Sequence, residues 1–185
     1  MLTLWDLIAP RPRSKTAVLP AANKPRSTRT SPRATPMRDR YDLMARRMLG
    51  EHAVRVRKWR SSMSGVAWQV TYRDGTVARL IESPRPRGPV SAAIFLHEIG
   101  HHAIGLGRFR PRCLEEYHAW MFALDQMDRW NLNITHGVRA RVRESLQHAV
   151  DKARRRGLAR VPGELAELLH GDGLIRFQST PRVRP

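Results

Sequence analysis

The residues of this sequence best suited to chemistry form an H-E-x-x-H motif at positions 97–101. On an α-helix, side chains four residues apart lie on one face, so His97 and His101 can hold the same metal ion. Glu98, the next residue along the helix, then faces whatever shares that ion. Two neutral imidazoles and a carboxylate are the groups of a zinc hydrolase. The motif therefore predicts that Zn2+ binds here and that amide bonds are cleaved by glutamate-assisted attack of zinc-bound water.

A catalytic zinc site usually has three protein ligands and one water, so the two histidines need a third partner. The segment that follows the motif offers Glu115, Glu116 and His118. Helical spacing aligns Glu116 with the apolar residues of that segment, and Glu115 and His118 with its polar residues. A carboxylate that faces the core is costly unless it is paired or bound to metal, which favours Glu116 as the ligand. His118 and Glu115 remain alternatives, and a salt bridge to a buried arginine is the non-catalytic interpretation of Glu116.

Three segments before the motif have the pattern of β-strands. Residues 54–59 alternate apolar and basic side chains, which is typical of a half-buried strand. Residues 66–73 and 76–81 are two further apolar runs, joined by Asp74-Gly75, a dipeptide that favours the tight turn of a hairpin. We therefore expect a small antiparallel sheet of about three strands.

The rest of the chain has helical periodicity. The motif itself is preceded by the apolar run 91–96, so its helix should be buried. Helices are predicted over residues 41–50, 90–104, 113–130, 137–156 and 164–169. The expected fold class is α+β, with the small sheet packed against the motif helix and the helices that follow it.

Charge and composition suggest how the chain is organised. Lys and Arg total 34 against 16 Asp and Glu, a formal charge of +18 that attracts polyanions such as nucleic acid. Residues 1–38, rich in proline and arginine, are expected to form a flexible basic arm. Residues 39–160 would be the catalytic domain and 161–185 a C-terminal tail. Nucleic acid is a candidate partner through the arm and the basic face of the 137–156 helix, although such faces are most often only solvated.

The expected compartment is the cytoplasm. Cys113 is the only cysteine, which excludes an internal disulfide and fits a reducing environment. No apolar run approaches the roughly 20 residues that cross a membrane. Residues 1–8 carry an acid and no basic residue, unlike a signal peptide, whereas the Arg/Ser-rich stretch after them leaves an organelle-targeting segment as the alternative.

Two motifs of this sequence together resemble those of a known family. Together with the H-E-x-x-H motif, residues 116–123 (EYHAWMFA) resemble the E-x-x-A-N-x-F-A signature of the ImmA/IrrE-like family of gluzincin metallopeptidases. The resemblance covers about residues 41–130 and implies a minimal zincin-like fold, a small sheet beside two metal-bearing helices. It implies His97, His101 and Glu116 as zinc ligands and Glu98 as the base. Trp120 stands where the family usually has asparagine, and no helix-turn-helix module is apparent. Residues 115–119 also resemble the metalloprotease half of ArdC-type antirestriction proteins.

This interpretation makes the partner a protein or peptide substrate, which could be associated with nucleic acid. The substrate could pair as an added strand at the edge of the sheet just before the motif helix. Tyr117, His118 and Tyr72 are candidates for a second donor to the developing oxyanion. The competing hypothesis is a non-enzymatic, basic nucleic-acid-binding protein with a structural or vestigial metal site. Structural zinc sites usually have four ligands rich in cysteine, and this chain has one cysteine. A third possibility is an inactive relative that uses the fold for protein interaction.

Overall fold

The computed structural model describes residues 36–170, without the side chains of residues 167, 168 and 170. The chain divides into two units, residues 1–33 and 34–185, and every described residue belongs to the second. The predicted arm, residues 1–38, lies outside the described residues except for its last three. The predicted tail, residues 161–185, lies outside them from residue 171 onward.

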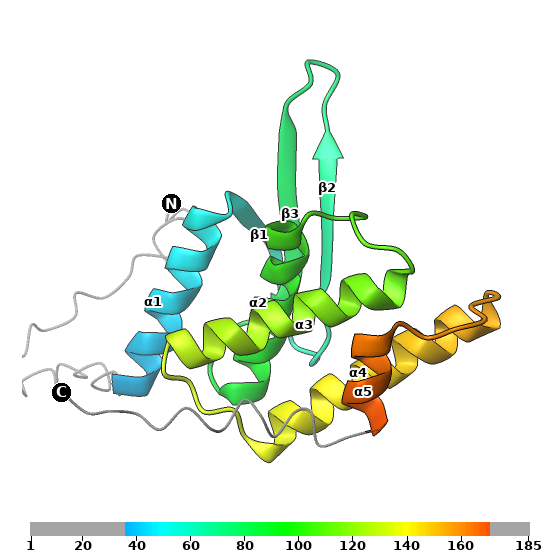
Figure 1. Cartoon of the computed structure of the whole chain (residues 1–185). Coiled ribbons are helices and arrows are strands. Elements are labelled where there is room, and N and C mark those ends of the chain that lie inside the picture. Colours follow the sequence, from blue (N-terminus) through cyan, green and yellow to red (C-terminus); the bar gives the residue numbers. More distant parts are fainter. Residues whose placement is uncertain (1–35, 171–185) are drawn as a thin grey trace, which may run out of the picture. The chain divides into compact units, whose positions relative to one another are not determined.

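The described residues form five helices and three strands, which confirms the α+β class (Figure 1). The helices begin and end within one residue of the predicted positions, except the first, which begins at Pro36 rather than Tyr41. Proline is well tolerated in the first turn of a helix, and the exposed turn that precedes Tyr41 carries no apolar periodicity to reveal it. In chain order, the elements are α1 (Pro36–Glu51), β1 (Val54–Arg60), β2 (Val66–Thr71), β3 (Val77–Pro84), α2 (Pro89–Ile104), α3 (Arg112–Arg129), α4 (His136–Arg155) and α5 (Gly163–His170).

The sheet has the strand order β1-β3-β2 and is mixed rather than wholly antiparallel. The β2–β3 hairpin is as predicted: Gly75 adopts φ +84°, and the Asp74 carboxylate accepts a hydrogen bond from the Thr76 backbone N–H at 2.9 Å. The β1 strand pairs with β3 in parallel, contrary to expectation. The chain reverses once between β1 and β2 and again at the hairpin, so β3 runs in the direction of β1. Because β2 occupies one edge of β3, β1 takes the other.

The motif helix α2 lies in the core between β3 and α3. Its residues from Ser91 to His102 are all buried, as the apolar run before the motif predicted. Figure 1 shows α3 lying across α2, while the β2–β3 hairpin extends away from the helices. The crossing is close because Gly100 has no side chain: a Cβ there would lie 2.7 Å from the carbonyl oxygen of Ala119 on α3. The absence of a side chain at Gly100 therefore allows α3 to pack closely against the motif helix α2.

The fourth helix, α4, packs against α3. Its apolar face, Val138, Val142, Leu146 and Val150, is buried, and the helix contacts both α3 and α2. The hydroxyl of Thr135 caps its N-terminus by accepting a hydrogen bond from the Val138 backbone N–H at 3.3 Å. Among the described residues, no helix is long and apolar enough to cross a membrane.

Candidate metal centre

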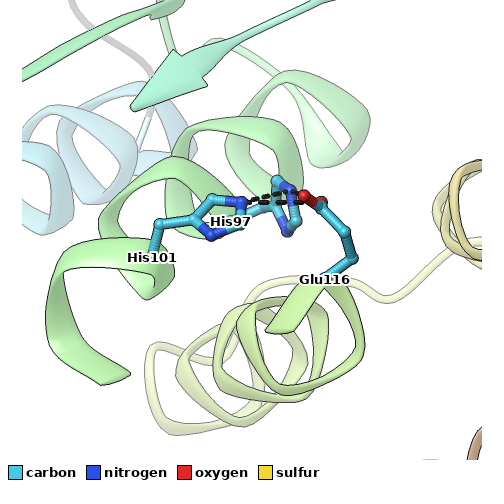
Figure 2. Close-up of side chains that lie close together, drawn as sticks. All are labelled: His97, His101 and Glu116. Carbon is cyan, nitrogen blue, oxygen red and sulfur yellow. Dashed lines mark hydrogen bonds and ion pairs between the residues drawn. The ribbon is translucent and has the colours of Figure 1, made fainter. Parts of the chain in front are cut away.

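Two helices bring the three predicted ligands together. His97 and His101 project from successive turns of α2, and Glu116 reaches them from the first turns of α3 (Figure 2). The two Nε2 atoms lie 3.2 Å apart. Glu116 Oε2 lies 3.3 Å from Nε2 of His97 and 3.5 Å from Nε2 of His101. The three donor atoms therefore form a nearly equilateral triangle.

This triangle has the dimensions that a zinc ion requires. Ligand atoms about 2.0–2.1 Å from a tetrahedral zinc ion lie about 3.3 Å from one another. The observed separations of 3.2, 3.3 and 3.5 Å match that value. Among the described residues, these three side chains are also the group of possible metal ligands whose donor atoms converge within 4.8 Å. Other first-row divalent ions accept the same donors, so the geometry is compatible with a metal ion and does not specify which one.

The electrostatics of the cluster favour a cation. Burial lowers the pKa of His97 to about 4, which leaves its imidazole neutral. Burial alone would raise the pKa of Glu116, but hydrogen bonds from His101 and His97 outweigh it and hold that pKa well below its usual range. For His101, burial acts to lower the pKa, and the neighbouring carboxylates of Glu116, Glu98 and Glu115 raise it overall. The cluster attracts positive charge, which a divalent ion supplies when it displaces a proton.

Glu98 lines the same cavity as the three candidate ligands. This cavity has a volume of about 240 Å³. The Glu98 side chain is only 5% exposed, and burial raises its pKa to about 8. The loop before β2 packs directly on it, because a Cβ at Gly65 would lie 2.6 Å from both Cγ and Cδ of Glu98 and closer still to Oε1. A side chain added at Gly65 would therefore require either the Glu98 carboxylate or the loop to move.

Trp120 supports the first ligand, a role that its sequence position did not suggest. Its ring stacks on the imidazole of His97, with the centroids 4.2 Å apart and the planes inclined by 21°. The indole N–H donates a hydrogen bond to the Ser145 hydroxyl on α4 at 3.0 Å. Stacking and the hydrogen bond together fix the orientation of the His97 ring.

Glu115 corrects the prediction for α3. It was expected on the polar face, yet its side chain is fully buried, whereas that of Glu116 is 21% exposed and faces the cavity. The backbone N–H of Gly107 donates to Glu115 Oε2 at 2.8 Å, so the loop between α2 and α3 folds back over this carboxylate. Its Oε1 lies 3.3 Å from Nδ1 of His101, not aligned for a hydrogen bond. Helical periodicity does not show that a loop covers one side of a helix. The two adjacent acids after the Gly-x-Gly loop were the sequence signal that one of them could be buried.

The other histidines near the motif lie outside the cluster. His118 packs on Phe109, with ring centroids 4.1 Å apart, and does not line the metal cavity. His102 is buried, and its Nε2 lies 3.1 Å from the carbonyl oxygen of Leu80, so it joins α2 to β3. His102 therefore does not take part in the cluster formed by His97, His101 and Glu116.

The predicted oxyanion donors are not found at the cavity. Tyr117, His118 and Tyr72 are absent from its lining, and the Tyr72 side chain is 54% exposed near the hairpin turn. The cations that line it are Arg112 and Arg141. One Arg141 amino group donates to the carbonyl oxygen of Met63 at 3.0 Å, and the other lies 3.5 Å from the Glu144 carboxylate. The buried Nε of Arg141 has no hydrogen-bond partner among the described residues. Sequence reasoning missed Arg141 because it lies on α4, far along the chain from the motif.

The strand available to a substrate also differs from the prediction. The strand just before the motif helix is β3, which is central in the sheet and pairs on both sides. The free edge beside the cavity belongs to β2, whose first residues, Val66 and Ala67, contribute to the cavity wall.

Comparison of the chain with family models, with curated proteins and with solved structures found no match.

Proposed function

We propose that this chain is a zinc-dependent metallopeptidase. The observation that carries the proposal is the position of Glu98, which lines one cavity with the converging donor atoms of His97, His101 and Glu116. Three ligands leave a fourth position for water or substrate, and an adjacent carboxylate can exchange protons with either. A structural zinc site has no need of such a carboxylate.

In this proposal, zinc supplies a Lewis acid that lowers the pKa of water and polarises the scissile carbonyl. Glu98 accepts the proton of the attacking water and then passes it to the leaving amine. Burial prepares Glu98 for this role, because a carboxylate with a pKa of about 8 is more basic than an exposed one. A bound dication would bring that pKa down, so proton transfer in both directions is accessible near neutral pH.

Arg141 is our candidate for the second donor to the oxyanion. Its guanidinium lines the cavity, and its Nε has a hydrogen still to donate. The hydrogen bond to Met63 holds the side chain in place, so the donor is oriented before substrate binds. Both arginines of the cavity are paired with a carboxylate, but the partner of Arg141 is Glu144, which lies outside the cavity lining, whereas Arg112 pairs with the proposed ligand Glu116 itself at 3.4 Å.

The substrate of this proposal is a protein or peptide bound in an extended form. The edge of β2 offers unpaired backbone groups beside the cavity, and an extended segment can add to such an edge by main-chain hydrogen bonds. We retain membership of the ImmA/IrrE-like gluzincins as part of the proposal, because both motifs contribute ligands to one cluster. A cytoplasmic location is also proposed, on the ground that Cys113 is a free, buried thiol.

The alternative is a non-enzymatic protein that binds nucleic acid. It is favoured by the exposed basic side chains of α4, Arg143, Lys152, Arg154 and Arg155, and by the formal charge of +18. Such a protein would bind DNA with a strong salt dependence and show no zinc-dependent cleavage. It gives no role to the buried carboxylate of Glu98.

The substitution Glu98→Gln tests the peptidase proposal against the nucleic-acid-binding alternative. It should keep the zinc content of the wild type while hydrolysis of fluorescein-labelled casein falls by about 10²–10⁴-fold, the usual contribution of a general base. Glu51→Gln, a change of an exposed carboxylate on α1, is the matched control and should leave both quantities unchanged. Wild-type hydrolysis by Glu98→Gln would remove Glu98 as the base.

A further inference from the structure

A second, larger cavity adjoins the metal centre, between the start of α3 and the C-terminal half of α4. It has a volume of about 720 Å³, within the range of ligand-binding pockets. Its lining includes the four cationic residues Arg110, Arg112, Lys152 and Arg156, together with His148. We call it the basic cavity.

Most of the positive charge in the basic cavity is uncompensated. Arg112 pairs with Glu116, but no carboxylate of the described chain forms an ion pair with Arg110, Lys152 or Arg156. All three of these side chains are exposed. Cations gathered in a concave surface repel one another and concentrate a positive potential, so an anionic ligand would be attracted and would relieve the repulsion.

The basic cavity and the metal cavity share a wall. Arg112, Glu116 and Ser145 line both. Glu116 marks the boundary: its Oε2 contacts the two histidines, and its Oε1 contacts the guanidinium of Arg112 at 3.4 Å. The two cavities therefore adjoin at these three side chains, so a peptide bound at the metal centre has the basic cavity beside it.

The chemistry of the lining favours an acidic peptide over nucleic acid. The lining of the basic cavity contains no Phe, Tyr or Trp and a single imidazole, that of His148, whereas proteins that bind single strands stack successive bases on several aromatic side chains. Its apolar lining consists of small aliphatic residues, among them Ala149, Ala153 and Leu158, which can contact the methylene groups of short acidic side chains. A duplex is too wide for a cavity of this size.

We propose that the basic cavity is a substrate subsite that binds Asp or Glu side chains on one side of the scissile peptide bond. This inference rests on the proposed peptidase function, because it is the shared wall with the metal centre that makes the cavity a substrate subsite. It assigns the substrate class as an acidic segment of a protein.

Fluorescence anisotropy of fluorescein-labelled hexaglutamate tests the proposal. The full-length protein carries Glu98→Gln, so that the peptide is bound and not cut. Lys152→Glu with Arg156→Glu reverses two charges inside the cavity. Arg143→Glu with Arg154→Glu is the matched control, because it reverses two exposed charges of α4 outside the lining. Both pairs change the net charge by the same amount, so long-range attraction weakens equally in each.

Reversal inside the cavity should weaken hexaglutamate binding by about tenfold, and the control pair by less than about threefold. The proposal would be overturned if both pairs weakened hexaglutamate binding equally. It would also be overturned if the Glu98→Gln protein without either pair did not bind hexaglutamate. A labelled single-stranded oligonucleotide forms the second arm, and selective loss of its binding with the cavity pair would instead assign the cavity to nucleic acid. Zinc content, measured on the same samples, tests the peptidase proposal separately. If the protein binds hexaglutamate but takes up no zinc, the anion site is supported and the peptidase proposal is refuted.

Discussion

The contact between Gly65 and Glu98 gives a prediction that separates the catalytic base from the metal. In Gly65→Ala, the new Cβ would lie 2.6 Å from Cγ and Cδ of Glu98. Ordinary carbon contacts are about 3.5–4.0 Å, so the overlap is about 1 Å at each atom. Either the loop or the Glu98 side chain must move, and we expect the side chain to be displaced because it ends in rotatable bonds beside a cavity.

The expected consequence is a loss of activity without a loss of zinc. Displacing a general base costs about 10²–10⁴-fold, and a 10³-fold loss corresponds to about 4 kcal/mol of transition-state stabilisation. The new Cβ meets Glu98 as its nearest neighbour, not His97, His101 or Glu116, so zinc affinity should change little. Initial rates on fluorescein-labelled casein and zinc content by elemental analysis measure the two effects.

A double-mutant cycle makes the prediction specific. If Gly65→Ala acts only through Glu98, adding it to Glu98→Gln should slow the reaction no further. Gly50→Ala is the control, because no atom lies within 4 Å of the Cβ it would add. Multiplicative effects of the two changes, or wild-type activity in Gly65→Ala, would refute the claim that this glycine positions the base.

Two further substitutions test the residues that support the site. Glu115→Gln keeps an acceptor for the Gly107 N–H but removes a buried charge beside His101, so we expect zinc to bind about 10–100-fold more weakly in competition with a chromophoric chelator. An unchanged affinity would exclude Glu115 as a positioning residue. Arg141→Ala should lower kcat by about 10²–10³-fold with little change in KM. The exposed control Arg143→Ala should leave both kcat and KM unchanged. A rise in KM alone would assign Arg141 to substrate binding.

The parts of this structure that depend on local chemistry could be predicted from the sequence. The H-E-x-x-H spacing specifies one face of one helix, so His97, Glu98 and His101 follow from the motif alone. The Asp74-Gly75 turn requires a positive φ, which defines the β2–β3 hairpin. The apolar run before the motif indicated a buried helix, and α2 is buried along most of its length.

The parts that depend on contacts between distant segments could not be predicted. Strand alternation does not reveal the pairing partner, so the parallel β1–β3 pair was missed. Periodicity treats a helix as isolated, and therefore assigned Glu115 to solvent although a loop covers it. Gly65 and Arg141 reach the cavity from a loop and from a later helix, where nothing in their sequence neighbourhoods indicates a metal centre.

The most direct test of the metal centre is the zinc content of three purified proteins: the wild type, Glu116→Ala and His118→Ala. Glu116 Oε2 lies within 3.5 Å of both histidine nitrogens, whereas His118 packs on Phe109 outside the cavity. We therefore predict an equimolar amount of zinc in the wild type and in His118→Ala, and a marked loss in Glu116→Ala. A wild type that takes up no zinc even after metal loading would contradict the account, and so would zinc that is retained without Glu116 and lost without His118.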